Sequence, residues 1–265
     1  SAIANNMGTS GGAGRLPTAL AVNSKFIAIG NQGGEVLVFD LYEQLKIVLG
    51  KTQQKQHGAT AEGIGGGGSV RRNDVTTAAS HVATGHFGSV TSIDLSSHGD
   101  YLLAGYGTGN IILWDVIKGA MLKHISDLHT SSICSARFTF VSMAGIGYGA
   151  VGDGEKLGAV SIDAGGLVNK LIFSQGRLVW SSSYSVETEC LLDGTAGQIL
   201  AMDVLPPLDM TAAAGAPTAI QGSAHQQKTA FDSRIVLVAL SSGRSSFAVS
   251  VEPKVSVLHR WARPS

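Results

Sequence analysis

Short runs of alternating apolar and polar residues recur along this chain, and each run is the length of a strand. The clearest are Val90 to Leu95, Tyr101 to Ala104 and Ile111 to Trp114. They are separated by His98-Gly99-Asp100 and by Gly107-Thr108-Gly109, which are turn sequences. Because side chains of a strand alternate between two faces, this pattern predicts a set of antiparallel β-strands.

The ends of the same segment add a more specific signal. It opens with Gly85-His86 and closes with Trp114-Asp115. A Gly-His start and a Trp-Asp end, at a period of about 40 to 45 residues, are typical of WD-type repeats, each of which supplies four strands to a propeller. The chain is therefore predicted to be all-β, a β-propeller of the WD-repeat type.

Other stretches repeat the pattern less clearly. Between Thr18 and Leu49 the same organisation recurs, with Phe39-Asp40 in the place of Trp114-Asp115, and Phe preserves the aromatic packing. Three further units are expected at about 121–173, 177–204 and 234–259, with Met202-Asp203 at the aromatic-Asp position. Closed propellers have about four to eight blades, so about five sets allow a closed five-bladed ring, but we favour an incomplete part, of about five blades, of a seven-bladed ring.

The domain organisation follows from the segments that lack strand periodicity. Residues 1–16 are predicted to be a flexible lead-in, and residues 17–265 to be the partial propeller. Segments rich in Gly, Ala, Ser and Gln interrupt the blades, and we expect inserted loops at about 52–84, 143–157 and 206–231.

Composition narrows the function classes. Charged residues make up 14% of the chain and the formal net charge is +0, so no nucleic-acid partner is expected. The longest apolar runs are strand-length, so the chain is not expected to cross a bilayer by itself. Cys134 and Cys190 are expected to be buried thiols in a reducing compartment.

Motifs for chemistry are weak. Gly63 and Gly147 each begin a GxGxxG match, but neither match lies between a strand and a helix, as a dinucleotide site requires. We expect no cofactor, no metal and no enzymatic activity. The residue types leave open a triad built on His86 or His129 with a serine, although nothing in the sequence singles out a serine.

The histidine of a WD repeat is typically part of a buried network with a Ser or Thr, a turn Asp and the Trp indole. His86 and Trp114 match two of these positions, whereas Thr108 stands where the turn Asp is expected. We therefore predict a structural role for His86, Thr108, Trp114 and Asp115, with a partial network, and the corresponding role for Phe39-Asp40.

A closer family resemblance is carried by the strand Phe26 to Gly30, the exit Leu45 to Gly50 and the Gly-x-Ile-x-x-Trp-Asp run that continues to His129. Over Pro17 to Phe140, and more loosely over Ala159 to Val204, the chain resembles the N-terminal propeller of the vacuolar protein sorting-associated protein 8 family. That family supplies the subunit specific to CORVET, an endosomal tethering complex.

The resemblance implies a scaffold that acts in endosome fusion and endosome-to-vacuole or lysosome protein transport. Its partners would be a Rab GTPase of early endosomes and class C sorting subunits. Its location would be cytoplasmic and peripheral on endosomal membranes, with indirect membrane contact through those partners. The family's zinc-binding RING lies beyond the propeller, so no zinc ligands are assigned, and no residue is assigned to a partner. The alternative is a generic WD-repeat adaptor, such as a ubiquitin-ligase substrate receptor or a signalling scaffold.

Overall fold

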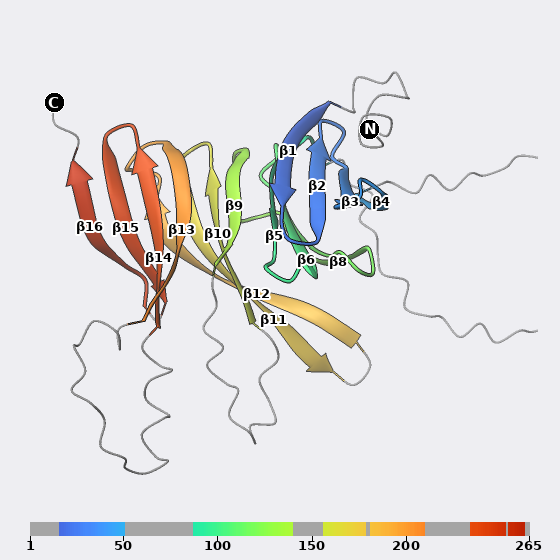
Figure 1. Ribbon diagram of the computed structural model, residues 1–265. Coiled ribbons are helices and arrows are strands. Elements are labelled where there is room, and N and C mark those ends of the chain that lie inside the picture. The colour runs from blue at the N-terminus through green and yellow to red at the C-terminus, as the bar shows by residue number, and fades with distance from the viewer. Residues whose placement is uncertain are drawn as a thin grey trace, which may run out of the picture.

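The computed structural model describes residues 16–50, 87–139, 156–178, 181–209, 234–252 and 254–262. These residues form four antiparallel sheets, each with four strands, which stand side by side in chain order (Figure 1). The four-stranded sheets are those expected of propeller blades.

The first two sheets are short and regular, and in each of them the strands pair in the order of the chain. The first contains β1 (Pro17–Val22), β2 (Phe26–Asn31), β3 (Val36–Asp40) and β4 (Leu45–Leu49), and the second contains β5 (Val90–Leu95), β6 (Tyr101–Tyr106), β7 (Ile111–Asp115) and β8 (Ala120–Ile125).

The third and fourth sheets have longer strands but the same neighbour-to-neighbour pairing. The third contains β9 (Ile133–Thr139), β10 (Lys156–Asp163), β11 (Leu167–Leu178) and β12 (Ser181–Asp193), and the fourth contains β13 (Ile199–Asp209), β14 (Arg234–Ser242), β15 (Ser245–Glu252) and β16 (Ser256–Ala262).

The number of sheets in the described residues differs from the number expected from the sequence. The stretch 188–192, expected to belong to a fourth unit, lies in β12, which pairs with β11 from Leu167–Asp193 to Leu178–Ser181. Residues 177–178 of that unit end β11, and residues 199–204 lie in β13, the first strand of the fourth sheet. The sequence-based unit boundary thus fell inside one long hairpin, and the described residues form four sheets rather than about five.

Two of the three expected aromatic-Asp pairs occupy equivalent positions in their sheets, and the third does not. Phe39-Asp40 and Trp114-Asp115 both end the third strand of a sheet, as expected. Met202-Asp203 lies in β13, the first strand of its sheet, so it is not the equivalent of the other two pairs.

The expected loops lie mostly outside the described residues. This holds for the whole of 52–84, for 143–155 and for 210–231, and for 1–15 of the lead-in. Residues 156–157 and 206–209, which were also assigned to loops, belong to β10 and β13.

The core is divided among the junctions between successive sheets. Alternation directs Leu102 and Trp114 toward the first sheet, and Leu103 and Leu113 toward the third. A further apolar cluster joins the third sheet to the fourth. Because both faces of the second sheet are covered, all five residues of β7 are buried. This face-to-face packing of apolar sheets is the main source of stability.

Polar side chains on the first strands connect neighbouring sheets. β1 packs against β5, β5 against β9, and β9 against β13. The backbone N–H of Ala136 donates to the hydroxyl of Ser92 at 2.9 Å, and that of Phe138 donates to the carboxylate of Asp94 at 2.7 Å. Burial raises the pKa of Asp94, against the opposing effect of the hydrogen bond from Phe138.

Two further contacts cross the other junctions. The Thr18 hydroxyl donates to the carbonyl oxygen of Val90 at 2.5 Å, between the first and second sheets. The buried ammonium group of Lys170 donates to the carbonyl oxygen of Val251 at 2.8 Å, between the third and fourth. Each junction thus combines apolar packing with at least one directional bond, which fixes how the two sheets are aligned.

Candidate functional site

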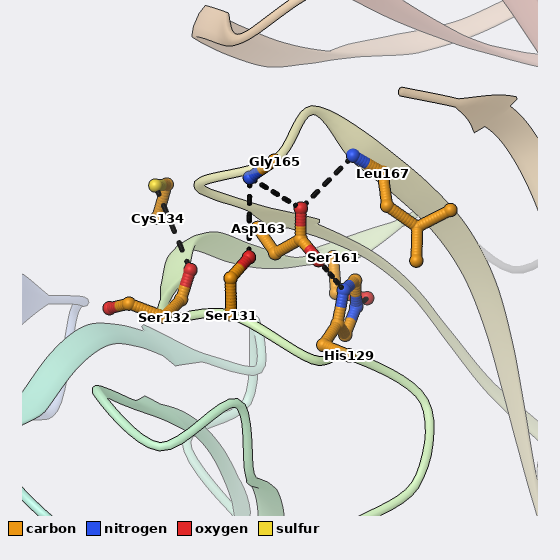
Figure 2. A network of polar contacts seen from close by, with 8 residues as sticks. All are labelled: His129, Ser131, Ser132, Cys134, Ser161, Asp163, Gly165 and Leu167. Carbon is orange, nitrogen blue, oxygen red and sulfur yellow. Dashed lines mark hydrogen bonds and ion pairs between the residues drawn. The ribbon is translucent and has the colours of Figure 1, made fainter. Parts of the chain in front are cut away.

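The most connected polar site lies at one end of the third sheet. His129 stands in the loop between β8 and β9, while Ser161 and Asp163 lie on β10 (Figure 2). The imidazole Nδ1 is 3.1 Å from the Asp163 carboxylate, and Nε2 is 2.8 Å from the Ser161 hydroxyl. The three side chains therefore have the connectivity of a Ser-His-Asp triad.

Asp163 is also bound to the turn that follows it. Its second carboxylate oxygen accepts the backbone N–H of Gly165 at 2.9 Å and that of Leu167 at 3.0 Å. The turn requires glycine at position 166, where φ is +89° and a Cβ would lie 2.3 Å from the carbonyl oxygen of Gly197. One carboxylate thus orients the histidine and closes the β10–β11 turn.

The protonation state follows from burial. Desolvation lowers the pKa of His129 below its usual value of 6.5, although the Asp163 carboxylate acts in the opposite direction. The ring is therefore neutral at pH 7. The Asp163 carboxylate can only accept a hydrogen bond when ionised, so Nδ1 carries the proton and Nε2 accepts from Ser161.

Access decides what this network can do. The exposed fractions are 3% for His129, 2% for Asp163 and 0% for Ser161. A catalytic serine must reach the carbonyl carbon of a substrate and place the developing oxyanion beside hydrogen-bond donors. The Ser161 hydroxyl is not accessible to solvent, so a substrate does not reach it. The network joins a loop, a strand and a turn, and it does not present an open nucleophile.

The kind of histidine network that was predicted around His86 is present around His129, one sheet later in the chain. His129 precedes Ile133, the first residue of β9, by four positions, as His86 precedes Val90 of β5. His86 itself lies outside the described residues. A Ser-x-Asp pair just before an Ala-Gly-Gly turn is the signal in the sequence that could have identified this site.

The position of the aspartate follows from turn geometry. In the third sheet the N–H of Gly166 donates to the carbonyl oxygen of Asp163, and in the second that of Gly109 donates to the carbonyl oxygen of Tyr106. Asp163 therefore corresponds to Tyr106 and not to Thr108, where the sequence reading expected it. The network does not need an acid at the Thr108 position.

Thr108 has different partners. Its hydroxyl donates to the carbonyl oxygen of Phe87 at 2.5 Å and accepts from the Asn110 amide at 2.6 Å. The Asn110 carbonyl oxygen lies 2.7 Å from Nε2 of His124, whose pKa burial lowers. This chain of contacts holds the β6–β7 turn against the segment before β5 and the last strand of the same sheet.

Trp114 and Tyr106 are buried in the junction with the first sheet. Neither the indole N–H nor the phenol O–H has a hydrogen-bond partner among the described residues. Burial raises the pKa of Tyr106 to about 12, against the opposing effect of the Trp114 indole. Within the part of the chain that the structure describes, the Trp indole does not join a histidine network.

Asp40 and Asp115 begin equivalent turns. Asp40 accepts the backbone N–H groups of Tyr42 and Gln44, and Asp115 accepts that of Lys118 at 2.8 Å. A hydrogen bond from Lys46 is the main cause that lowers the pKa of Asp40. Both aspartates therefore cap the turn between the third and fourth strands of a sheet.

The cysteines differ from the expectation. Cys134 on β9 and Cys190 on β12 are both exposed rather than buried. Each side chain lies on the solvent-exposed side of its strand. The residue type alone does not indicate which side of a strand is covered. Partial burial still raises the pKa of both thiols.

Over the described ranges, no three His, Cys, Asp or Glu side chains are grouped closely enough to bind a metal ion. The same ranges contain no helix whose length and hydropathy would allow it to span a bilayer.

Sequential four-stranded sheets, Asp-capped turns and a buried His-Ser-Asp network define a WD-type β-propeller. A family model described as the Vps8 β-propeller matches residues 74–265, so the chain belongs to the Vps8 β-propeller family. The matched range begins after the first sheet.

Curated relatives agree with this assignment. The chain is 27% identical over 192 residues to the mouse vacuolar protein sorting-associated protein 8 homolog, and 27% identical over 194 residues to the human one. Each match covers 72% of this chain and 10% of the relative, so the chain spans a small part of these proteins. The fission yeast WD repeat protein iqw1 is 41% identical over 56 residues, which are 21% of this chain and 7% of that protein.

Solved structures support the fold alone. The β-propeller domain of Myceliophteria thermophila Cps50 (Swd1) matches with a TM-score of 0.50 and 12% identity, over 94% of this chain and 56% of that one. The WD40 domain of fission yeast SCAP matches with a TM-score of 0.51 and 11% identity, over 94% and 45%. Covering about half of each propeller fits an arc of four sheets.

Proposed function

We propose that this chain is a protein-binding scaffold of CORVET, a membrane-tethering complex that acts in endosome fusion and in transport to the vacuole or lysosome. Its partners are a Rab GTPase of early endosomes and the class C sorting subunits. It acts in the cytoplasm at the surface of endosomes, and its membrane contact is indirect. The match of residues 74–265 to the Vps8 β-propeller is the observation that carries this proposal.

The geometry favours binding over chemistry. The triad-like network is closed to solvent, whereas turns between strands are exposed, with Tyr42 86% and Ile117 67% accessible. Sheets held together by apolar junctions and directional bonds provide a rigid support, and loops on such a support are where binding usually occurs. The protein would therefore act by holding partners in fixed relative positions.

The test is affinity capture from cytosol with the purified chain as bait and an unrelated WD propeller as the matched control. Recovery of class C sorting subunits, and of an early-endosomal Rab that binds better with a GTP analogue than with GDP, supports the proposal. Recovery of cullin adaptors in their place, at levels above the control bait, would contradict it and favour the generic adaptor.

A further inference from the structure

The last strand of the fourth sheet differs from the last strands of the other sheets. β16 lies at the end of its sheet, and among the described strands it pairs only with β15 (Figure 1). All seven of its residues are exposed, whereas β8, the last strand of the second sheet, has one exposed residue among six. β16 carries three exposed large apolar side chains, Val257, Leu258 and Trp261, while the described side chains of β8 and β12 include none.

The free edge of β16 is not a surface that another sheet of the ring covers. Successive sheets pack face to face through their first strands, β1 on β5, β5 on β9 and β9 on β13. β8 has a sheet on either side, and within the described residues it still forms a ladder only with β7. The outer edge of a sheet thus stays open where both neighbouring sheets are present, and its backbone N–H and C=O groups are available for pairing.

The exposure of Arg260 and Val257 does not result from a missing neighbour either. Phe247 and Val249 belong to the apolar cluster shared by the third and fourth sheets. Val257 is the register partner of Val249. The Arg260 guanidinium lies 5.4 Å from the centre of the Phe247 ring, so both side chains face the third sheet. Val257 nevertheless remains 48% exposed, and Arg260 is exposed as well, so the two side chains border the open edge in the presence of the adjacent sheet.

The strand is also basic in a chain that has no net charge. Between positions 234 and 265 the sequence contains five Lys or Arg residues and one acidic residue, whereas the formal net charge of the whole chain is +0. Arg244, Lys254 and Arg260 are exposed. Nε of Arg260 donates to the Ser245 hydroxyl at 3.1 Å, which holds the guanidinium in place. A cation that is already positioned binds a carboxylate at a lower entropic cost.

We propose that the outer edge of β16 binds an extended acidic segment of a partner protein, which adds a fifth strand to the fourth sheet. In this mode of recognition, backbone hydrogen bonds along the edge supply affinity, and the side chains on the two faces of the strand supply specificity. Charge complementarity identifies the class of segment, because the charged side chains that the structure describes between positions 238 and 262 are the three cations.

The two faces of β16 define the pattern of the segment. Arg260 is on one face, and His259 and Trp261 are on the other, where their ring centres are 4.4 Å apart. Because the side chains of a strand alternate between faces, the segment places acidic residues beside Arg260 and apolar residues beside Trp261, at alternate positions. The pairing with β15 skips Leu258, so the regular edge runs from His259 to Ala262.

Charge and backbone together argue against two other occupants. A second copy of β16 would bring cations opposite cations, which opposes pairing. An anionic lipid surface would match the charge and the exposed Trp261, but it offers no strand to pair with the open backbone edge. An acidic strand uses both the charge and the edge.

The test measures the binding of synthetic peptides to the purified 265-residue chain by fluorescence anisotropy. The probe alternates Glu and Val over seven residues, the length of β16. One control peptide alternates Lys and Val, and another has the sequence of the probe with N-methylated backbone amides, which cannot donate along an edge. Arg260→Glu is the test variant, and Lys25→Glu, a charge reversal on the exposed β1–β2 turn, is the matched control.

We expect the Glu-Val probe to bind the chain, and to bind Arg260→Glu at least about fivefold more weakly, while Lys25→Glu binds it unchanged. Arg260→Gln retains a donor for Ser245 and should weaken binding in the same direction, so it replaces the charge reversal if that variant does not fold. Probe binding does not depend on CORVET membership, which the affinity capture tests separately.

Four results would overturn the proposal. The first is a probe that does not bind, or that binds no better than the Lys-Val or the N-methylated peptide. The second is an unchanged affinity in the folded Arg260 variants. The third is binding of the chain to vesicles of phosphatidylcholine and phosphatidylserine without binding of the probe, which would favour a lipid surface. The fourth is a dimer mass by light scattering that the probe does not reduce, because a second copy would then occupy the edge.

Discussion

Nε2 of His129 lies 2.8 Å from the hydroxyl oxygen of Ser161, and both residues are almost completely shielded from solvent. The bond joins the loop before β9 to the end of β10, and Asp163 fixes the other ring nitrogen. Residue types that perform hydrolysis in an open cleft stabilise a fold when they are buried, because each polar atom finds its partner inside the protein.

Removing one member of this network should be costly. Asp163→Ala leaves the Nδ1–H of His129 and two turn N–H groups without their acceptor, and we expect a loss of about 2 to 4 kcal/mol in the free energy of unfolding. Asp163→Asn retains an acceptor oxygen and should lose less. Urea denaturation of the 265-residue chain measures both changes.

Ser131→Ala serves as the control, because the half-buried Ser131 contributes only one 3.2 Å hydrogen bond to the same turn. A loss for Asp163→Ala no larger than that for Ser131→Ala would show that the network does not stabilise the sheet.

Stability should fall as the pH is lowered through the histidine range. The pKa of His129 is lowered in the folded protein, so below about pH 6.5 the unfolded state binds a proton that the folded state does not. The contribution of His129 to the free energy of unfolding is therefore complete above about pH 6.5. It is lost as the pH falls from there to the pKa of His129 in the folded protein, by at most about 1.4 kcal/mol per pH unit.

The measurement is the free energy of unfolding between pH 5 and 7.5 for the chain and for His129→Gln, which does not titrate. The slope should be smaller in the variant. His124 also has a lowered pKa and contributes with the same sign, so His124→Gln is made in parallel. An unchanged slope in His129→Gln would assign the pH dependence to other groups.

The sequence predicted the architecture where the strands are short and the turns explicit. In the first two sheets, Gly34 and Gly109 end tight turns and the alternation is regular, so strand positions and the equivalence of Phe39 and Trp114 followed directly. The β11–β12 hairpin could not be delimited, because its strands, of 12 and 13 residues, are much longer than the strands of the first two sheets.

The site was only partly predictable for a different reason. The types of residue in a WD network are recognisable, but the position of the acid depends on turn geometry: Asp163 occupies the place of Tyr106. The two turn positions, represented by Tyr106 and Thr108, are two residues apart, so alternation alone does not distinguish them. Exposure of Cys134 and Cys190 likewise depends on which face of a strand is covered.

Two glycines with positive φ should respond differently to alanine. At Gly197, φ is +80° and a Cβ would meet nothing within 4 Å, so Gly197→Ala should cost about 1 kcal/mol for the backbone conformation alone. At Gly166, φ is +89° and the Cβ would lie 2.3 Å from a backbone oxygen, so Gly166→Ala should cost clearly more. Thermal unfolding of the two variants measures the difference, and equal losses would refute the close approach of the two turns.

Replacing Tyr106 and Tyr101 by Phe compares a buried hydroxyl without a hydrogen-bond partner among the described residues with one that has a partner. The Tyr106 hydroxyl has no hydrogen-bond partner among the described residues, so Tyr106→Phe removes a desolvated polar atom and should be neutral or stabilising by up to about 1 kcal/mol. The Tyr101 hydroxyl lies 3.2 Å from that of Tyr184, in a contact between the second and third sheets, so Tyr101→Phe should destabilise by about 1 kcal/mol. Chemical denaturation measures the free energy of unfolding of both variants. If Tyr106→Phe proved the more damaging of the two, the Tyr106 hydroxyl would have a partner in solution, and the junction between the first two sheets would contain a polar bond that this structure does not show.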